Sequence, residues 1–118
     1  MIRVDLPYPH KALWPNGRAH YLAKYRQTAD HHHWAYKATL AALRGLQRPV
    51  LPDRVPVHIT VHPMPRGPKP DKDNCAAAAK AYLDGIADAL KVNDPCFEAP
   101  IATFATPRDG RFVVEVGS

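Results

Sequence analysis

The sequence predicts an α+β fold: a small mixed four-stranded sheet with two helices, in the order β-α-β-α-β-β. Two observations carry this prediction. Short segments alternate apolar and polar residues, as half-buried strands do, whereas two longer segments repeat apolar residues at the spacing of a helix face. Residues 1–118 contain no internal repeat and no obvious linker, so we expect a single domain in which the helices cover one face of the sheet.

Residues 2–6, IRVDL, alternate apolar and polar and predict the first strand. The following PYPHKALWPNGR is expected to be a loop, because prolines and a glycine interrupt it. A helix is predicted from about His20 to Leu46. A break near Thr28–Asp30 stays open, since either residue could cap a new helix. The apolar positions at roughly helical spacing are Leu22, Tyr25, Ala29, Tyr36, Leu40 and Leu43.

The clearest strand is VPVHITVHPMP, residues 55–65, which alternates throughout. A second helix is predicted from about Asn74 to Lys91. Residues 101–107 and 111–116 are expected to form a hairpin, because Asp109-Gly110 between them is a strong turn signal. The inward positions of the strand are Val55, Val57, Ile59 and Val61. The core stripe of the helix is Ala76, Ala79, Leu83, Ile86, Ala87 and Leu90.

The chain carries 16 Lys and Arg against 11 Asp and Glu, a formal net charge of +5. This balance fits contact with nucleic acid, although unrelated proteins share it. No apolar run approaches the roughly 18 residues of a membrane-spanning helix. The N-terminus lacks the apolar segment of a signal peptide, so we expect a cytoplasmic protein without a membrane partner. Cys75 and Cys96 show no metal-ligand spacing and are expected to be small buried residues.

The segment PRGPKPDKDN, residues 65–74, places Asp71 and Asp73 one residue apart before the second helix. Two converging carboxylates suit a hard cation such as Mg²⁺, which prefers oxygen ligands and retains several waters. A structural alternative stays open, because Asp73 or Asn74 could cap the helix and acids are favoured near its positive end. Three basic residues of the segment would lower the cost of holding two acids together and could contact phosphate: Arg66, Lys69 and Lys72.

Residues further along the chain favour a metal site over helix capping alone as the role of Asp71 and Asp73. Lys80 follows Asp73 by two helical turns, so both lie on one face of a continuous helix. Lysine side chains lean toward the helix N-terminus, which would bring the Lys80 ammonium toward the carboxylates. Asp84 and Asp88 continue this face, although an ordinary solvated stripe would look the same. Asp94, in the segment VNDP, is either a turn residue or a further acid of the site.

The ordered set DKDN (71–74), Lys80, YLDGIADAL (82–90) and Asn93-Asp94 resembles the RusA family of Holliday junction resolvases. These crossover junction endodeoxyribonucleases come mostly from phages and prophages. The opening LPYPHKALWPNGRAH, with Asn16, Arg18 and His20, also looks like the start of that family. The resemblance covers nearly the whole chain, and its specific part is the DxDN motif with the helix and acidic loop after it.

This resemblance implies a RusA-like fold and a homodimer that binds four-way DNA junctions. It implies paired symmetric nicks, in DNA recombination and repair. Mg²⁺, with Mn²⁺ as a substitute, would be held by Asp71, Asp73 and Asp94, and Lys80 would be the catalytic lysine. Such a metal activates water and clamps phosphate oxygens, while a lysine offsets the developing negative charge. The residues expected to contact DNA are Arg18, Arg66, Lys69 and Lys72.

Two positions depart from the family pattern. Some members carry the lysine three residues after the DxDN asparagine, where this chain has Ala77, and Lys80 comes one turn later. The acidic loop often holds two adjacent acids, where this chain has Asn93-Asp94. The second departure keeps open a catalytically inactive, junction-binding dimer of the same fold. A basic interaction protein without a DNA role is a third alternative.

Other candidate residues are better explained by structure. The tract HHH, residues 31–33, is poorly arranged for one metal, because consecutive helix positions diverge by about 100°. We expect a structural or solvent-exposed role for it. His58 and His62 share a strand face but lack a third ligand nearby. Trp14 and Trp34 are expected in the core or at a dimer contact rather than as platforms for base stacking.

Overall fold

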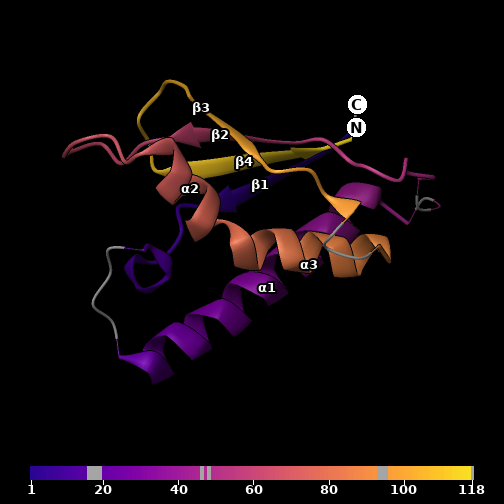
Figure 1. The fold of residues 1–118 in the computed structure, drawn as a ribbon, viewed down its shortest axis with the longest axis horizontal. Coiled ribbons are helices and arrows are strands. Elements are labelled where there is room, and N and C mark those ends of the chain that lie inside the picture. Colours follow the sequence, from indigo (N-terminus) through magenta and orange to yellow (C-terminus); the bar gives the residue numbers. More distant parts are fainter. Residues whose placement is uncertain (16–19, 46, 48, 93–95, 118) are drawn as a thin grey trace.

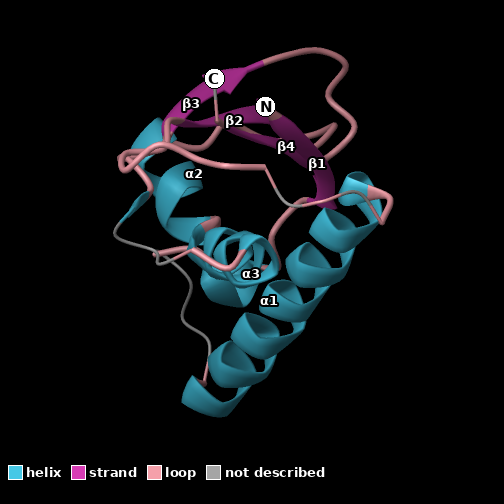
Figure 2. Ribbon diagram, turned by 90° about the vertical axis from the view of Figure 1, so that its right-hand side faces the viewer, coloured by secondary structure: helices cyan, strands magenta, loops and turns pink. Residues whose placement is uncertain are grey.

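The computed structural model describes residues 1–15, 20–45, 47, 49–92 and 96–117. Within these residues, a four-stranded mixed sheet forms one layer and three α-helices lie against one of its faces (Figure 1 and Figure 2). The predicted α+β class is therefore confirmed, with one α-helix more than expected. The elements are β1 (Ile2–Pro7), the 3₁₀ helix η1 (Lys11–Leu13), α1 (Tyr21–Leu43), β2 (Val57–His62), α2 (Lys72–Ala78), α3 (Lys80–Leu90), β3 (Ile101–Phe104) and β4 (Arg111–Val116).

The strand order is β1-β4-β2-β3. β4 pairs antiparallel with both β1 and β2, while β3 pairs parallel with β2. The predicted hairpin of residues 101–107 and 111–116 is therefore wrong. β4 contains the run Phe112–Val114, which is buried on both faces as a central strand requires. β3 is short and its Ile101 is 66% exposed, which suits an edge. The burial of β3 and β4 therefore agrees with the observed strand order, whereas the turn signal at Asp109-Gly110 predicted the wrong pairing.

The alternation predicted for the second strand is confirmed. All four of its inward side chains are buried, and they face the helices across the core. The Tyr82 hydroxyl of α3 donates a hydrogen bond to the Pro7 carbonyl oxygen at 2.8 Å, which fixes α3 against the end of β1. The largest fully buried side chains include Tyr82, Phe112, Ile59, Ile86, Val4 and Val114. The core therefore lies between the inner face of the sheet and the helix layer.

The second predicted helix, residues 74–91, is divided at Ala79. α2 begins at Lys72, earlier than expected, and α3 begins at Lys80 and runs in a different direction (Figure 1). Alanines surround the division, so helix propensity alone gives no sign of it. The predicted stripe is buried except for Ala76, which is only partly covered. Six buried residues were missing from it: Cys75, Ala78, Ala81, Tyr82, Gly85 and Ala89.

α1 is one continuous helix, without the break considered near Thr28–Asp30. The Thr28 hydroxyl donates to the Lys24 carbonyl oxygen at 2.8 Å instead of capping a new helix. The apolar stripe predicted for this helix is wrong: Leu22, Tyr25 and Leu40 are exposed. The buried face carries His31, Ala35 and Thr39, spaced one helical turn apart. Among the described helices, none is both long and apolar enough to cross a membrane.

His31 is a buried structural residue, as expected for its tract. Its Nε2 accepts a hydrogen bond from the His10 backbone N–H at 3.0 Å, so the proton lies on Nδ1, which donates to the Gln27 carbonyl oxygen at 2.7 Å. The ring stacks on Tyr82, with centroids 5.0 Å apart, and also contacts Trp34. His31 thereby fixes the loop before η1 onto α1 as a neutral ring.

Acid should weaken the fold through this histidine. Burial lowers the pKa of His31 below its usual 6.5, so the unfolded chain takes up the proton first. The stabilisation is therefore complete above about pH 6.5 and is lost as the pH falls below it, by at most about 1.4 kcal/mol per pH unit. Urea unfolding at pH 7.5 and 5.5 measures this loss. His31→Gln should remove it.

His33→Gln is the matched control, because His33 is exposed in the same tract. This variant should retain the pH dependence of the unmodified chain. An equal pH dependence in both variants would show that His31 does not contribute it.

Candidate metal and phosphate site

Asp71 and Asp73 stand together at the start of α2. Asp71 is the N-cap residue, in an extended conformation, and its side chain makes no capping hydrogen bond to the described turn. Asp73 lies in the first helical turn. The expectation that Asp73 or Asn74 caps the helix is therefore wrong. Both aspartates are exposed, and capping does not account for the Asp71 carboxylate, which leaves it accessible to a ligand.

Cys75 lies one helical turn after Asp71, and its backbone N–H donates to the Asp71 carbonyl oxygen at 3.0 Å. It is fully buried, and burial raises the pKa of its thiol to about 11, with the negative charge of Asp71 adding to the shift. The thiol therefore stays protonated at neutral pH. Cys75 is a core residue, as predicted, and supplies neither a nucleophile nor a metal ligand. The accessible ligand atoms at this end of α2 are carboxylate oxygens.

The loop before α2 is fixed by the loop that joins β3 to β4. Arg108 Nη2 donates to the Gly67 carbonyl oxygen at 2.7 Å, and the Gly110 N–H donates to the Pro63 carbonyl oxygen at 3.1 Å. His62 Nδ1 lies 2.9 Å from the Pro107 carbonyl oxygen. Figure 1 shows both loops at the end of the sheet where α2 begins. The acids are thus carried on a loop that two hydrogen bonds join to the β3–β4 loop, next to the contact of His62 in β2 with Pro107.

Basic side chains surround the acidic pair. Three of the residues expected to contact DNA are exposed on this loop and on the first turn of α2: Arg66, Lys69 and Lys72. The Lys69 ammonium lies 5.5 Å from the centroid of the Phe104 ring, a cation–π arrangement. Arg18, the fourth residue expected to contact DNA, lies outside the described residues.

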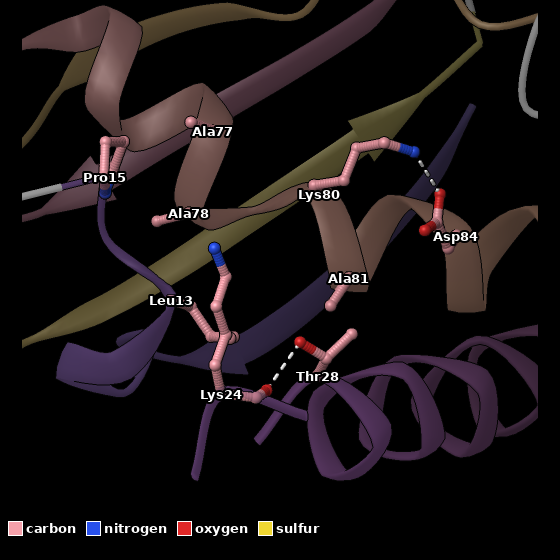
Figure 3. A pocket seen from close by; sticks show the side chains of 9 residues that line it. All are labelled: Leu13, Pro15, Lys24, Thr28, Ala77, Ala78, Lys80, Ala81 and Asp84. Carbon is pink, nitrogen blue, oxygen red and sulfur yellow. Dashed lines mark hydrogen bonds and ion pairs between the residues drawn. The ribbon is translucent and has the colours of Figure 1, made fainter. Parts of the chain in front are cut away.

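Lys80 lines a second location, a cavity of about 330 Å³ between α1 and the α2–α3 junction (Figure 3). Its ammonium donates to Asp84 Oδ1 at 2.7 Å, one turn toward the C-terminus of α3. The prediction that one continuous helix points Lys80 back toward Asp73 is therefore wrong, because Ala79 divides the helix. Ala77 lines the same cavity, so both positions considered for the lysine open into one space.

Asp88 and Asp94 are the remaining acids that the sequence placed near the site. Asp88 pairs with His32 Nε2 of α1 at 2.7 Å, so it joins the two helices instead of extending a site. Asn93 and Asp94 lie outside the described residues. Val92, the last described residue before them, follows α3 and donates its backbone N–H to the Ala87 carbonyl oxygen at 3.0 Å.

Within the described part of the chain, no three His, Cys, Asp or Glu side chains gather closely enough to hold a metal. His58 and His62, which share a strand face as predicted, have other partners. His58 Nε2 lies 2.8 Å from Thr103 Oγ1, and His62 is largely buried. Mg²⁺ is commonly bound through one or two carboxylates together with substrate phosphates. Asp71 and Asp73 are the exposed carboxylates at the start of α2 that such a mode would use.

Comparison with known proteins identifies a relative in Xylella fastidiosa, an uncharacterized protein. The two are 34% identical over 118 residues, which cover 98% of this chain and 76% of the relative. This chain belongs to the same family. No family model matches it. The Xylella relative carries no stated activity, so membership of its family leaves the chemistry to be argued from the site itself.

Sequence reasoning missed two contributors to these locations. Arg108 holds the acidic loop, although its segment PRDG was considered only as part of a turn. Thr28 lines the Lys80 cavity, although it was considered only as a helix cap. The signal that could have indicated Arg108 is a basic residue directly before the predicted turn Asp109-Gly110. No signal in the sequence indicates the second, because the contact depends on how α1 packs.

Proposed function

We propose that this protein is a Mg²⁺-dependent, structure-selective endodeoxyribonuclease of RusA type, which resolves Holliday junctions by paired symmetric nicks. The observation that carries the proposal is the pair Asp71 and Asp73, exposed at the start of α2 on a loop rich in basic residues. Carboxylates beside cations suit a metal and a phosphate at one place. A cytoplasmic role in DNA recombination and repair is part of the proposal.

In this proposal Asp71 and Asp73 hold Mg²⁺ or Mn²⁺, with Asp94 as the third carboxylate. When bound, the metal lowers the pKa of water and stabilises charge on phosphate oxygens. The side chains of the loop and first turn hold the DNA backbone without reading its sequence: Arg66, Lys69 and Lys72. Lys80, the proposed catalytic lysine, would leave Asp84 to meet a phosphate at the cavity it shares with Lys24.

A homodimer belongs to the same proposal. Resolution of a four-way junction needs two matched cuts in strands related by two-fold symmetry. A dimer with two-fold symmetry presents two identical sites in that relation, whereas one chain presents a single Asp71–Asp73 pair.

A catalytically inactive junction-binding dimer is the second candidate. Two observations favour it: Asn93 stands beside Asp94 where the resembling family often has a second acid, and the Lys80 ammonium is paired with Asp84 at 2.7 Å. Both features would reduce metal-dependent cleavage, while the basic side chains proposed to bind DNA stay in place.

Incubation of the purified protein with a synthetic four-way junction tests the proposal. We expect paired, symmetric nicks with Mg²⁺ or Mn²⁺ and none with EDTA, because the carboxylates act through the metal. Junction binding without nicks in either metal would favour the inactive dimer. Equal binding of junction and duplex DNA at moderate salt would instead favour a basic protein without a junction role.

A further inference from the structure

A small cavity lies between the acidic loop and the β3–β4 loop, separate from the Lys80 cavity. Its volume is about 170 Å³, enough for a compact group but too small for a nucleoside. Both loops belong to the end of the sheet where α2 begins (Figure 1). The residues that line it are Pro63, Lys69, Phe104, Ala105, Thr106 and Arg108.

Two cationic side chains and no carboxylate are among these lining residues. The Lys69 ammonium is held over the Phe104 ring, at 5.5 Å from its centroid. Arg108 uses Nη2 to bind the Gly67 carbonyl oxygen at 2.7 Å, which fixes the guanidinium between the loops. Apart from Thr106, the other lining residues are apolar, so the two cations are the charged groups that this lining offers to an anion.

The Arg108 Nε atom is buried and has no hydrogen-bond partner among the described residues. A guanidinium nitrogen can only donate, so the missing partner is an acceptor. Buried donors of this kind are normally satisfied, so the missing acceptor is a water, an ion or a group of a ligand. A negatively charged acceptor in the cavity would meet both the Lys69 ammonium and the Arg108 guanidinium, which line it.

We propose that this cavity binds a phosphate group, with Arg108 and Lys69 as its ligands. Phosphate matches the donors of a guanidinium and the charge of both cations. The source of the phosphate rests on the proposed function: Lys69 precedes Asp71 by two residues, so a DNA backbone phosphate held here lies beside the proposed metal ligands. Arg108 is then a positioning residue for the strand to be cut.

The phosphate site itself is tested without DNA. In ¹⁵N-labelled protein the Nε–H signal of Arg108, identified by its loss in Arg108→Gln, is followed while inorganic phosphate is added. We expect a saturable shift of this signal, and a much weaker response in Lys69→Gln, which leaves the Arg108–Gly67 bond in place. A signal that does not move in the unmodified protein overturns the proposal.

The DNA source is tested by the salt dependence of junction binding. Loss of one phosphate contact should reduce the slope of log K against log salt by about 0.9 in Arg108→Gln and in Lys69→Gln. Arg111→Gln is the matched control, because Arg111 follows in the same segment but donates to Asp109 at 3.1 Å. Thermal unfolding of each variant shows whether the fold is retained.

The outcomes separate the two proposals. A phosphate-induced shift with a reduced slope in the two cavity variants alone supports a backbone phosphate. Equal slopes in all three variants, with the shift present, overturn DNA as the source and leave a site for a free phosphate compound. If phosphate moves the signal but the protein neither binds nor cuts DNA, the cavity proposal holds and the proposed nuclease function fails.

Discussion

Asp73→Asn is expected to abolish metal-dependent cleavage of a four-way junction while preserving junction binding. The substitution keeps the size of the side chain but removes the negative charge that Mg²⁺ requires. We expect a loss of more than about 100-fold, because changes to residues that merely orient metal ligands already cost about 10- to 100-fold. Cleavage rates are measured under single-turnover conditions with Mg²⁺ and with Mn²⁺, and binding is measured in EDTA.

The fold should tolerate this change. Asp73 is exposed in the first turn of α2, where its interaction with the helix dipole is typically about 0.3–1 kcal/mol. Asp53→Asn is the control, because Asp53 is an exposed acid outside the helices and its loss changes the net charge equally. Normal cleavage by Asp73→Asn would place the chemistry elsewhere. Loss of binding together with a large fall in melting temperature would show that the acid serves folding.

Gly85→Ala is expected to destabilise the protein, against the usual effect of this substitution in a helix. Alanine normally favours a helix over glycine by about 1 kcal/mol. At this position a Cβ atom would overlap the backbone carbonyl oxygen of His32 in α1 and would lie 3.1 Å from the Ala35 Cβ. A backbone atom cannot rotate away, so the two helices must separate. Overpacking of this kind typically costs about 1–3 kcal/mol.

Thermal unfolding measures this effect. A net loss of about 2 kcal/mol would lower the melting temperature by roughly 8 °C for a domain of this size. The reference variant is Ala29→Gly, on the exposed side of α1, which should lose only the helix-propensity difference of about 1 kcal/mol. A melting temperature raised by Gly85→Ala would mean that α1 and α3 are further apart than the structure places them.

Strands were predictable here wherever one face alone is buried. The alternation in β1 and β2 is a direct consequence of their inward and outward side chains, and it identified both. β4 was found as a strand but paired wrongly, because a local turn signal says nothing about a strand that inserts between two others. The same limit applies to α1, whose buried face is formed by His31, Ala35 and Thr39 and not by its large apolar residues.

The candidate site was predictable to the extent that it is local. Asp71 and Asp73 are close in the chain, so a metal pair could be inferred before any fold was known. Lys80 was placed by extending one helix through Ala79, and the division there redirects its side chain to Asp84. Arg108 reaches the acidic loop from 37 positions after Asp71, through contacts set by the strand order. Such long-range contacts leave no periodic trace in a sequence.

The central position of β4 also governs when the protein can fold during synthesis. β1 pairs only with β4 in the described sheet, from Ile2 opposite Val116 to Pro7 opposite Arg111. β1 leaves the ribosome well before β4 and must therefore wait for it, and the loop that holds the acidic segment comes just before β4. Contacts between such distant residues form slowly. The loop that carries Asp71 and Asp73 is thus organised only after β4 has been made, so a nascent chain would carry these aspartates on a loop that is not yet held in place.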